Sequence, residues 1–284
     1  MSTIQAGSGA SHPGAGEGDL VAGIDDWLRC QRTGATLVVT LNRPERRNAI
    51  AWEQIAQLAT VLTRAAGEET IRAVVLTGAG AAFCAGGDVK DQASRQAWGT
   101  VERMRRVAPM LAAIEAVWDF PKPLIAAING VAAGAGVGLA LLCDVRYAAE
   151  GSRLGFAFVR VGLGPDYGVS YTLPRTVGPG QAARLLFSGR YVEAEEAQAI
   201  GLVEAVHPPD RLLDEALALC AEIGARAPFG VRLAKHAMRS ATAADLATTL
   251  RSEMQAQFLA SATDDHREGT TAFTEKREPH FQDR

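Results

Sequence analysis

The sequence has no excess of positive charge and no long apolar run. Its 284 residues include 29 Lys and Arg against 32 Asp and Glu, a formal net charge of −3, and the pI is about 6.0. No apolar stretch reaches the roughly 20 residues that a helix needs to cross a bilayer. Because the chain lacks both a basic field and a spanning segment, we expect neither nucleic acid nor a membrane as a partner.

Cysteine is sparse and unclustered. The four residues, Cys30, Cys84, Cys143 and Cys220, form no CxxC pair, and the first residues do not have the pattern of a secretory signal. The five histidines are scattered, without a serine partner or the spacing of metal ligands. We therefore expect reduced thiols, no metal, non-catalytic histidines and a cytoplasmic location.

Large apolar residues are nearly absent from residues 1–22, which cannot offset the entropy of being ordered. We predict a flexible tail there. Residues 23–209 mix strand and helix patterns and form the predicted core domain. Past Pro208-Pro209 only helical patterns occur, at 211–225, 229–240, 243–260 and 264–275, so residues 210–284 are predicted to be a helical domain that serves oligomerisation.

The core pattern alternates between strands and helices. A hairpin or two edge strands, broken at Thr33-Gly34, is predicted for 25–41, and Asn48 is placed to cap a helix that ends at Gly67. Further predicted strands are 73–77, 124–128, 145–149 and 154–158; further helices are 101–118, 136–143, 181–187 and 194–199. One face of the 101–118 helix carries Val107, Met110, Leu111, Ile114 and Val117. This alternation predicts an α/β fold.

Two glycine-rich runs follow predicted strands. The first is Phe83–Lys90 (FCAGGDVK) and the second is Asn129–Gly136 (NGVAAGAG). Each exposes backbone amides with almost no side chain in the way, which is how a chain prepares N–H donors for an oxygen that will become negative. Either run alone would favour an ordinary tight turn; the two runs together favour a pair of donors for one oxygen.

Five motifs occur in one order along the chain: Leu41-Asn42-Arg43-Pro44 with Asn48-Ala49, Phe83–Asp88, Pro123–Gly130, Cys143-Asp144 and Leu173–Gly178. In this order and spacing they resemble the enoyl-CoA hydratase/isomerase (crotonase) superfamily, from about residue 25 to Glu275-Lys276-Arg277. The resemblance implies a spiral of ββα units with a C-terminal helical domain, and homotrimers or dimers of trimers. It also implies a coenzyme A thioester as substrate, with no separate cofactor.

The resemblance also assigns roles to particular residues. It implies that the backbone amides of Gly87 and Ala135 stabilise a thioester enolate. It places the adenine and pantetheine near the Arg46 region and near the backbone around Ala85, Asp88 and Val89, with Lys90 or Arg46 near the phosphates. Lysine and arginine are common on solvated surfaces, so either side chain could equally make no contact.

Family hydratases use two glutamates, and the matching positions here are Gly138 and Phe158. Neither can ionise, so paired acid–base delivery of water loses its usual groups. Asp166 remains, in a loop (GPDYG) that resembles the segment where family isomerases place one catalytic aspartate. One carboxylate suffices to move a double bond, so we expect isomerisation with Asp166 as proton shuttle. A plain turn role for Pro165-Asp166 is the alternative.

The residues around Asp166 leave its environment open. Phe156, Phe158, Val159 and Tyr167 could form a dry acyl pocket that raises the pKa of Asp166, or could be ordinary core. Arg160 could pair with Asp166 and lower that pKa. Other readings of the chain are a divergent hydratase, a dehalogenase, lyase or hydrolase on the same scaffold, or a catalytically silent acyl-CoA binder.

Overall fold

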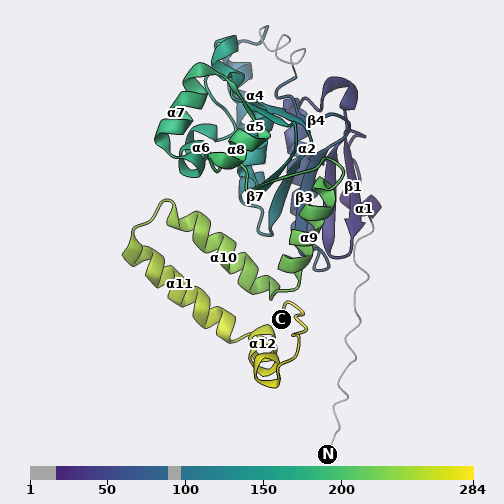
Figure 1. Cartoon of the computed structure of the whole chain (residues 1–284), viewed down its shortest axis with the longest axis vertical. Coiled ribbons are helices and arrows are strands. Elements are labelled where there is room, and N and C mark those ends of the chain that lie inside the picture. Colours follow the sequence, from purple (N-terminus) through teal and green to yellow (C-terminus); the bar gives the residue numbers. More distant parts are fainter. Residues whose placement is uncertain (1–16, 89–96) are drawn as a thin grey trace, which may run out of the picture.

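The computed structural model describes residues 17–88 and 97–284, and these residues are organised around two sheets. The larger sheet has the strand order β1-β2-β3-β5-β7-β10. Figure 1 labels three of its strands, β1, β3 and β7. Its strands are β1 (Leu28–Thr33), β2 (Thr36–Leu41), β3 (Ala73–Gly78), β5 (Leu124–Ile128), β7 (Val145–Ala149) and β10 (Ala205–His207). Parallel neighbours are separated in sequence by crossovers, so the predicted α/β class is confirmed.

The first two strands form the predicted hairpin. β1 and β2 pair antiparallel with Thr33 opposite Thr36, and Gly34 supplies the left-handed backbone of the turn, with φ of 59°. β2 then pairs in parallel with β3. β2 is therefore an interior strand, and only β1 lies at that edge of the sheet. The central strands are almost wholly buried because both faces of the sheet are covered.

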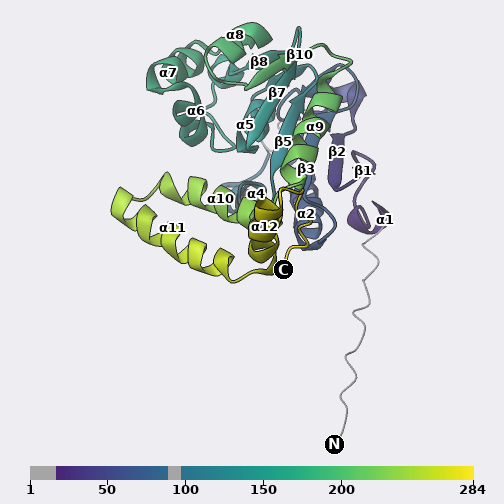
Figure 2. The same ribbon diagram turned by 60° about the horizontal axis from the view of Figure 1, so that its bottom comes forward.

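Helices cover both faces of the larger sheet (Figure 2). α9 (Leu212–Gly224) packs on one face, with Val38, Val75 and Ile125 beneath it. On the other face Val39 and Val74 share one core with residues of α2 (Trp52–Gly67) and α4 (Thr100–Trp118). Alternate residues of each strand therefore enter opposite cores, as the pleat of a strand requires.

The smaller sheet holds the candidate site. Its strand order is β4-β6-β8-β9, with β4 (Ala82–Cys84), β6 (Val131–Ala133), β8 (Arg153–Gly155) and β9 (Tyr191–Glu193). Around it lie α5 (Ala135–Leu142), the 3-10 turn η2 (Ala157–Val161), α6 (Val169–Val177), α7 (Pro179–Ser188) and α8 (Ala194–Ala199). β4 and β6 run parallel, so both glycine-rich turns leave the sheet at the same edge.

The last helices project away from the sheets (Figure 1). They are α10 (Pro228–Ala241), α11 (Leu246–Ser261) and α12 (Asp264–Glu275), close to the predicted bounds. α10 and α11 bury none of their residues. The division of the chain at residues 209 and 210 stays a prediction. None of the described helices combines the length and apolar character that crossing a bilayer requires.

Two predictions for the N-terminal region are wrong. Residues 17–22 are not loose: α1 (Glu17–Leu20) buries Leu20, and Arg64 of α2 donates to the carbonyls of Leu20 and Ala22. Residues 1–16 lie outside the described residues. Asn48 does not cap α2, which begins four residues later with Ala51 as N-cap.

Three local predictions need correction further along the chain. On α4, Leu111 is exposed, while Ile114 and Val117 are buried as predicted. The predicted strand 154–158 ends at Gly155 and continues as η2, so Phe158 lies in a helical turn. The sequence pattern missed α6, which buries Val169 and Leu173, because the helix contains Pro174, a residue that usually breaks a helix.

Candidate active site

The two glycine-rich turns lie against each other at the end of the smaller sheet. Cys84 of β4 is opposite Ala132 of β6, and the turns follow directly. A Cβ atom on Gly86 would lie 2.7 Å from the carbonyl oxygen of Ala133 and 3.6 Å from the amide nitrogen of Ala135. Gly86 also has φ of 104°, in the region that favours glycine. The first turn therefore packs its backbone directly on the second.

A second close contact joins the same turns. A Cβ atom on Gly136 would lie 2.1 Å from the carbonyl oxygen of Cys84, so only glycine fits there. The Cys84 side chain is fully buried, and burial raises the pKa of its thiol to about 12. A thiol of this kind stays protonated and is not a nucleophile at neutral pH. Cys84 is a packing residue of the site.

The backbone around Gly87 directs its amide away from the neighbouring segment. Ile50 donates its N–H to the carbonyl of Gly86 at 2.8 Å, and Asp88 donates its N–H to the carbonyl of Ile50 at 3.1 Å. Gly87 lies between these two bonds, in a parallel bridge with Ile50. Its own N–H has no acceptor among residues 17–88 and 97–284, so within that part of the chain it is available to a ligand.

The amide of Ala135 is available for a different reason. Ala135 is the first residue of α5, so its N–H has no acceptor inside the helix. Gly134, the N-cap, has φ of 52° and ψ of −121°, which a residue with a side chain rarely adopts. The positive end of the helix dipole lies at this terminus and favours negative charge.

Two asparagines that the sequence analysis gave no role in the site hold the loop before β4. Asn48 donates its side-chain amide to the carbonyls of Ala79 and Ala82, at 2.9 and 2.7 Å. Asn129, at the start of the second glycine-rich run, donates to the carbonyl of Gly80 at 2.8 Å. These bonds tie both family motifs to one loop. The sequence did carry a signal for these two residues, since Asn48 and Asn129 both lie inside motifs that resemble the family.

Asp88 lies between two guanidinium groups. Its carboxylate is 3.1 Å from Arg43 and 3.1 Å from Arg46. Asp88 is buried, while the Arg46 side chain is 38% exposed. Arg46 therefore neutralises a buried carboxylate and keeps an exposed edge. Arg43, which had no predicted role of its own, forms the second ion pair with Asp88.

The other predicted coenzyme A contacts are only partly described. Ala85 lies in the first turn and donates its N–H to the carbonyl of Arg47 at 2.9 Å. Val89 and Lys90 lie outside the described residues.

At the first position that matches a hydratase glutamate, a side chain has no room. A Cβ atom on Gly138 would lie 2.5 Å from Cβ of Tyr167 and 3.2 Å from a methyl group of Val169. Tyr167 is 6% exposed and has φ of 50°, an uncommon backbone for a bulky residue. Tyr167 therefore occupies the space beside α5 that a longer side chain at position 138 would need.

The second such position is also apolar. Phe158 is 5% exposed, and a Cβ atom on Gly134 would lie 3.9 Å from its ring. The Phe158 ring is thus next to the second glycine-rich turn. Phe156 is fully buried, whereas Val159 is largely exposed. Of the predicted dry pocket, only Phe156, Phe158 and Tyr167 are buried.

Asp166 lies beside this apolar group but on the exposed side of its loop. Its backbone carbonyl accepts the N–H of Val169 at 3.0 Å, at the start of α6. The next residue in the chain, Tyr167, is buried. Asp166 is therefore an exposed residue of this loop, and the buried Tyr167 that follows it anchors the loop to the core.

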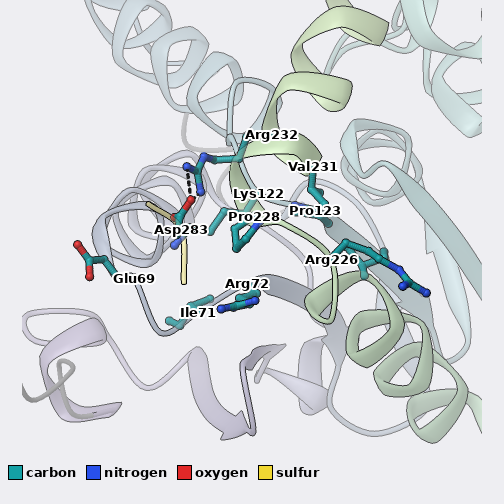
Figure 3. Close-up of a pocket in the computed structure, with 11 residues that line it drawn as sticks. Glu69, Ile71, Arg72, Lys122, Pro123, Arg226, Pro228, Val231, Arg232 and Asp283 are labelled. Carbon is teal, nitrogen blue, oxygen red and sulfur yellow. Dashed lines mark hydrogen bonds and ion pairs between the residues drawn. The ribbon is translucent and has the colours of Figure 1, made fainter. Parts of the chain in front are cut away.

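A small cavity at the base of α10 is not part of this site (Figure 3). Its volume is about 10 Å³, no more than one water needs. Figure 3 shows Lys122 near the ion pair of Arg232 and Asp283, whose closest N–O distance is 2.7 Å. Lys122 donates to the carbonyls of Ala65 and Glu68, at the end of α2. The ion pair joins α10 to the C-terminal residues, and the Lys122 bonds tie the segment before β5 to the end of α2.

Comparison with known proteins identifies the family. The enoyl-CoA hydratase/isomerase family matches residues 31–284. The chain belongs to this family. The 2,3-dehydroadipyl-CoA hydratase of Escherichia coli (strain K12) is 39% identical over 258 residues, which are 90% of this chain and 99% of that protein. The 1,2-epoxyphenylacetyl-CoA isomerase of the same organism is 39% identical over 256 residues, 86% of this chain and 94% of that protein.

Solved structures agree with the family. An enoyl-CoA hydratase from Bacillus anthracis superimposes with a TM-score of 0.86 at 36% identity, covering 91% of this chain and 100% of that chain. The predicted crotonase-like fold is confirmed, and the protein is an acyl-CoA enzyme of the enoyl-CoA hydratase/isomerase family.

Proposed function

We propose that the protein is an enoyl-CoA isomerase that moves a double bond along the acyl chain of a coenzyme A thioester. One observation carries this choice. The two positions that match hydratase glutamates hold Gly138 and Phe158, and Tyr167 fills the space beside Gly138. Hydration needs a group that positions and deprotonates water, whereas a double-bond shift needs one carboxylate.

The amides of Gly87 and Ala135 form the oxyanion hole in this proposal. The thioester carbonyl oxygen accepts both N–H groups, and the bonds strengthen as the oxygen becomes an enolate. The contact between Gly86 and the second turn supports this pairing, because it keeps the two donors at one place. Loss of one donor of this kind typically costs about 2.7–4 kcal/mol of barrier.

Asp166 is the proton shuttle in this proposal. Its carboxylate takes a proton from the carbon next to the thioester, and the electron pair of that C–H bond delocalises into a dienolate. The same proton then returns to a carbon further along the chain, and the double bond has moved. A bound acyl group would cover the exposed carboxylate and separate it from water.

Coenzyme A would lie beside the pair of Asp88 and Arg46. The exposed edge of Arg46 suits a phosphate, and the backbone near Ala85 suits the pantetheine amides; Val89 and Lys90 are proposed as further contacts. No cofactor other than this coenzyme A is needed, since proton transfer changes no oxidation state. We also propose a cytoplasmic location.

The second candidate reaction is hydration by a divergent site. Two relatives with equal identity to this chain are named for hydration and for isomerisation, so similarity alone does not choose between them. A dehalogenase, lyase or hydrolase on this scaffold and a silent acyl-CoA binder are weaker alternatives, because no feature of the described residues favours them over isomerisation.

We further propose that the chain assembles as a trimer or dimer of trimers. An exposed apolar residue recurs every four positions along α11: Leu246, Leu250, Met254 and Phe258. The helix buries no residue of its own. An apolar stripe of this kind is typical of a helix that packs on a partner.

Incubation with a 3-enoyl-CoA and with a 2-enoyl-CoA tests the proposed reaction. Isomerisation of the first without hydration of the second is the expected result. Hydration of the 2-enoyl-CoA at an ordinary enzymatic rate would overturn the proposal in favour of the hydratase. Tight binding of both thioesters without turnover would support the silent binder instead.

A further inference from the structure

Tyr167 is a buried residue with an unusual backbone conformation. It is buried, yet its backbone is left-handed, and Gly168 after it is left-handed as well, with φ of 71°. A bulky residue seldom adopts this conformation unless its surroundings hold it there. The backbone of the loop is therefore bent so that the Tyr167 side chain points inward while Asp166 before it stays exposed.

The inward side chain meets α5 one turn after the proposed oxyanion donor. Gly138 is three residues beyond Ala135, and its N–H bonds to the carbonyl of Gly134 at 3.0 Å in the first turn of the helix. Cβ of Tyr167 lies 2.5 Å from where a Cβ of Gly138 would be. The absence of a side chain at 138 and the presence of a large one at 167 thus belong to one packing arrangement.

The other neighbours of this contact are apolar. Val169 is fully buried, with a methyl group 3.2 Å from the Cβ position of Gly138. Phe158 covers the second glycine-rich turn from the side. Tyr167, Val169 and Phe158 therefore form a wall without a carboxylate next to the first turn of α5.

We propose that Tyr167 is a positioning residue that sets the reaction type. Its ring keeps water out of the space beside Gly138, and its anchoring fixes the carboxylate of Asp166. This inference rests on the proposed isomerase function. The relevant step is the proton transfer of the double-bond shift. Asp166 removes a proton from one carbon of the substrate and returns it to another carbon before that proton exchanges with solvent.

The test follows the transferred proton. A 3-enoyl-CoA is isomerised in D2O by the wild type, Tyr167→Phe and Tyr167→Ala, and the deuterium in the product is measured by mass spectrometry under single-turnover conditions. Tyr167→Ala should incorporate several-fold more deuterium per product molecule than the wild type. Tyr167→Phe, which keeps the ring, should match the wild type. A residue that only stabilised the fold would change the rate without changing this ratio.

Unchanged deuterium in the Tyr167→Ala product would overturn the inference, and so would an equal increase in Tyr167→Phe, because the ring would then not be the barrier. If Tyr167→Ala does not fold, Tyr167→Leu replaces it, with the same expected increase. A wild type that does not isomerise overturns the proposed function and this inference together. An active wild type with an unchanged ratio overturns the inference alone.

Discussion

Tyr167 occupies the side-chain space of Gly138: a Cβ atom on Gly138 would lie 2.5 Å from Cβ of Tyr167. Gly138→Ala should therefore destabilise the protein by about 1–3 kcal/mol through overpacking. Tyr167→Gly removes the opposing atom, so the added methyl group should cost less in that background. Urea unfolding of the two single variants and the double variant measures this coupling. Additive effects would contradict the contact.

Gly136→Ala should separate the two glycine-rich turns. The new methyl group would lie 2.1 Å from the carbonyl oxygen of Cys84, and the amide of Ala135 would have to move with the helix. We expect kcat to fall by about 10²-fold or more, the cost of a displaced oxyanion donor. Gly180→Ala is the matched control, because nothing lies within 4 Å of a Cβ atom there. Equal activity of the two variants would argue against the oxyanion hole.

Lys122 should make stability increase with pH. Burial lowers its pKa from 10.5 to about 8, and the positive charge of Arg232 acts in the same direction. Between these pH values the unfolded chain holds more protons than the folded one, so the free energy of unfolding rises with pH. Urea unfolding across this window should show the wild type gaining stability relative to Lys122→Met. A constant difference between them would mean that Lys122 keeps its ordinary pKa.

The apolar stripe of α11 should be needed for assembly. Leu250→Glu places a charge within the stripe and should release monomers, which light scattering after size-exclusion chromatography would detect. Ser252→Glu adds the same charge to an exposed position on the opposite side of the helix and should leave the assembly intact. Identical masses for both variants would place the subunit interface elsewhere.

The sequence was informative where a pattern reports local geometry. The hairpin at Thr33-Gly34 and the strands at 73–77 and 124–128 follow from turn chemistry and apolar runs, and the structure has them. It was less informative where distant contacts decide. Asn48 looks like a helix cap, yet its side chain bonds to the loop of Ala79 and Ala82. The contact between Gly138 and Tyr167 depends on how α5 packs against the loop before α6. A local sequence pattern does not predict such packing.

The rate at which Asp166→Asn isomerises a 3-enoyl-CoA tests the central claim most directly. Asparagine keeps the shape of the side chain but cannot accept the proton. The account predicts that the wild type isomerises the substrate and that the variant is slower by about 10²–10⁴-fold, the usual contribution of a general acid–base group. Isomerisation by Asp166→Asn at the wild-type rate would contradict it.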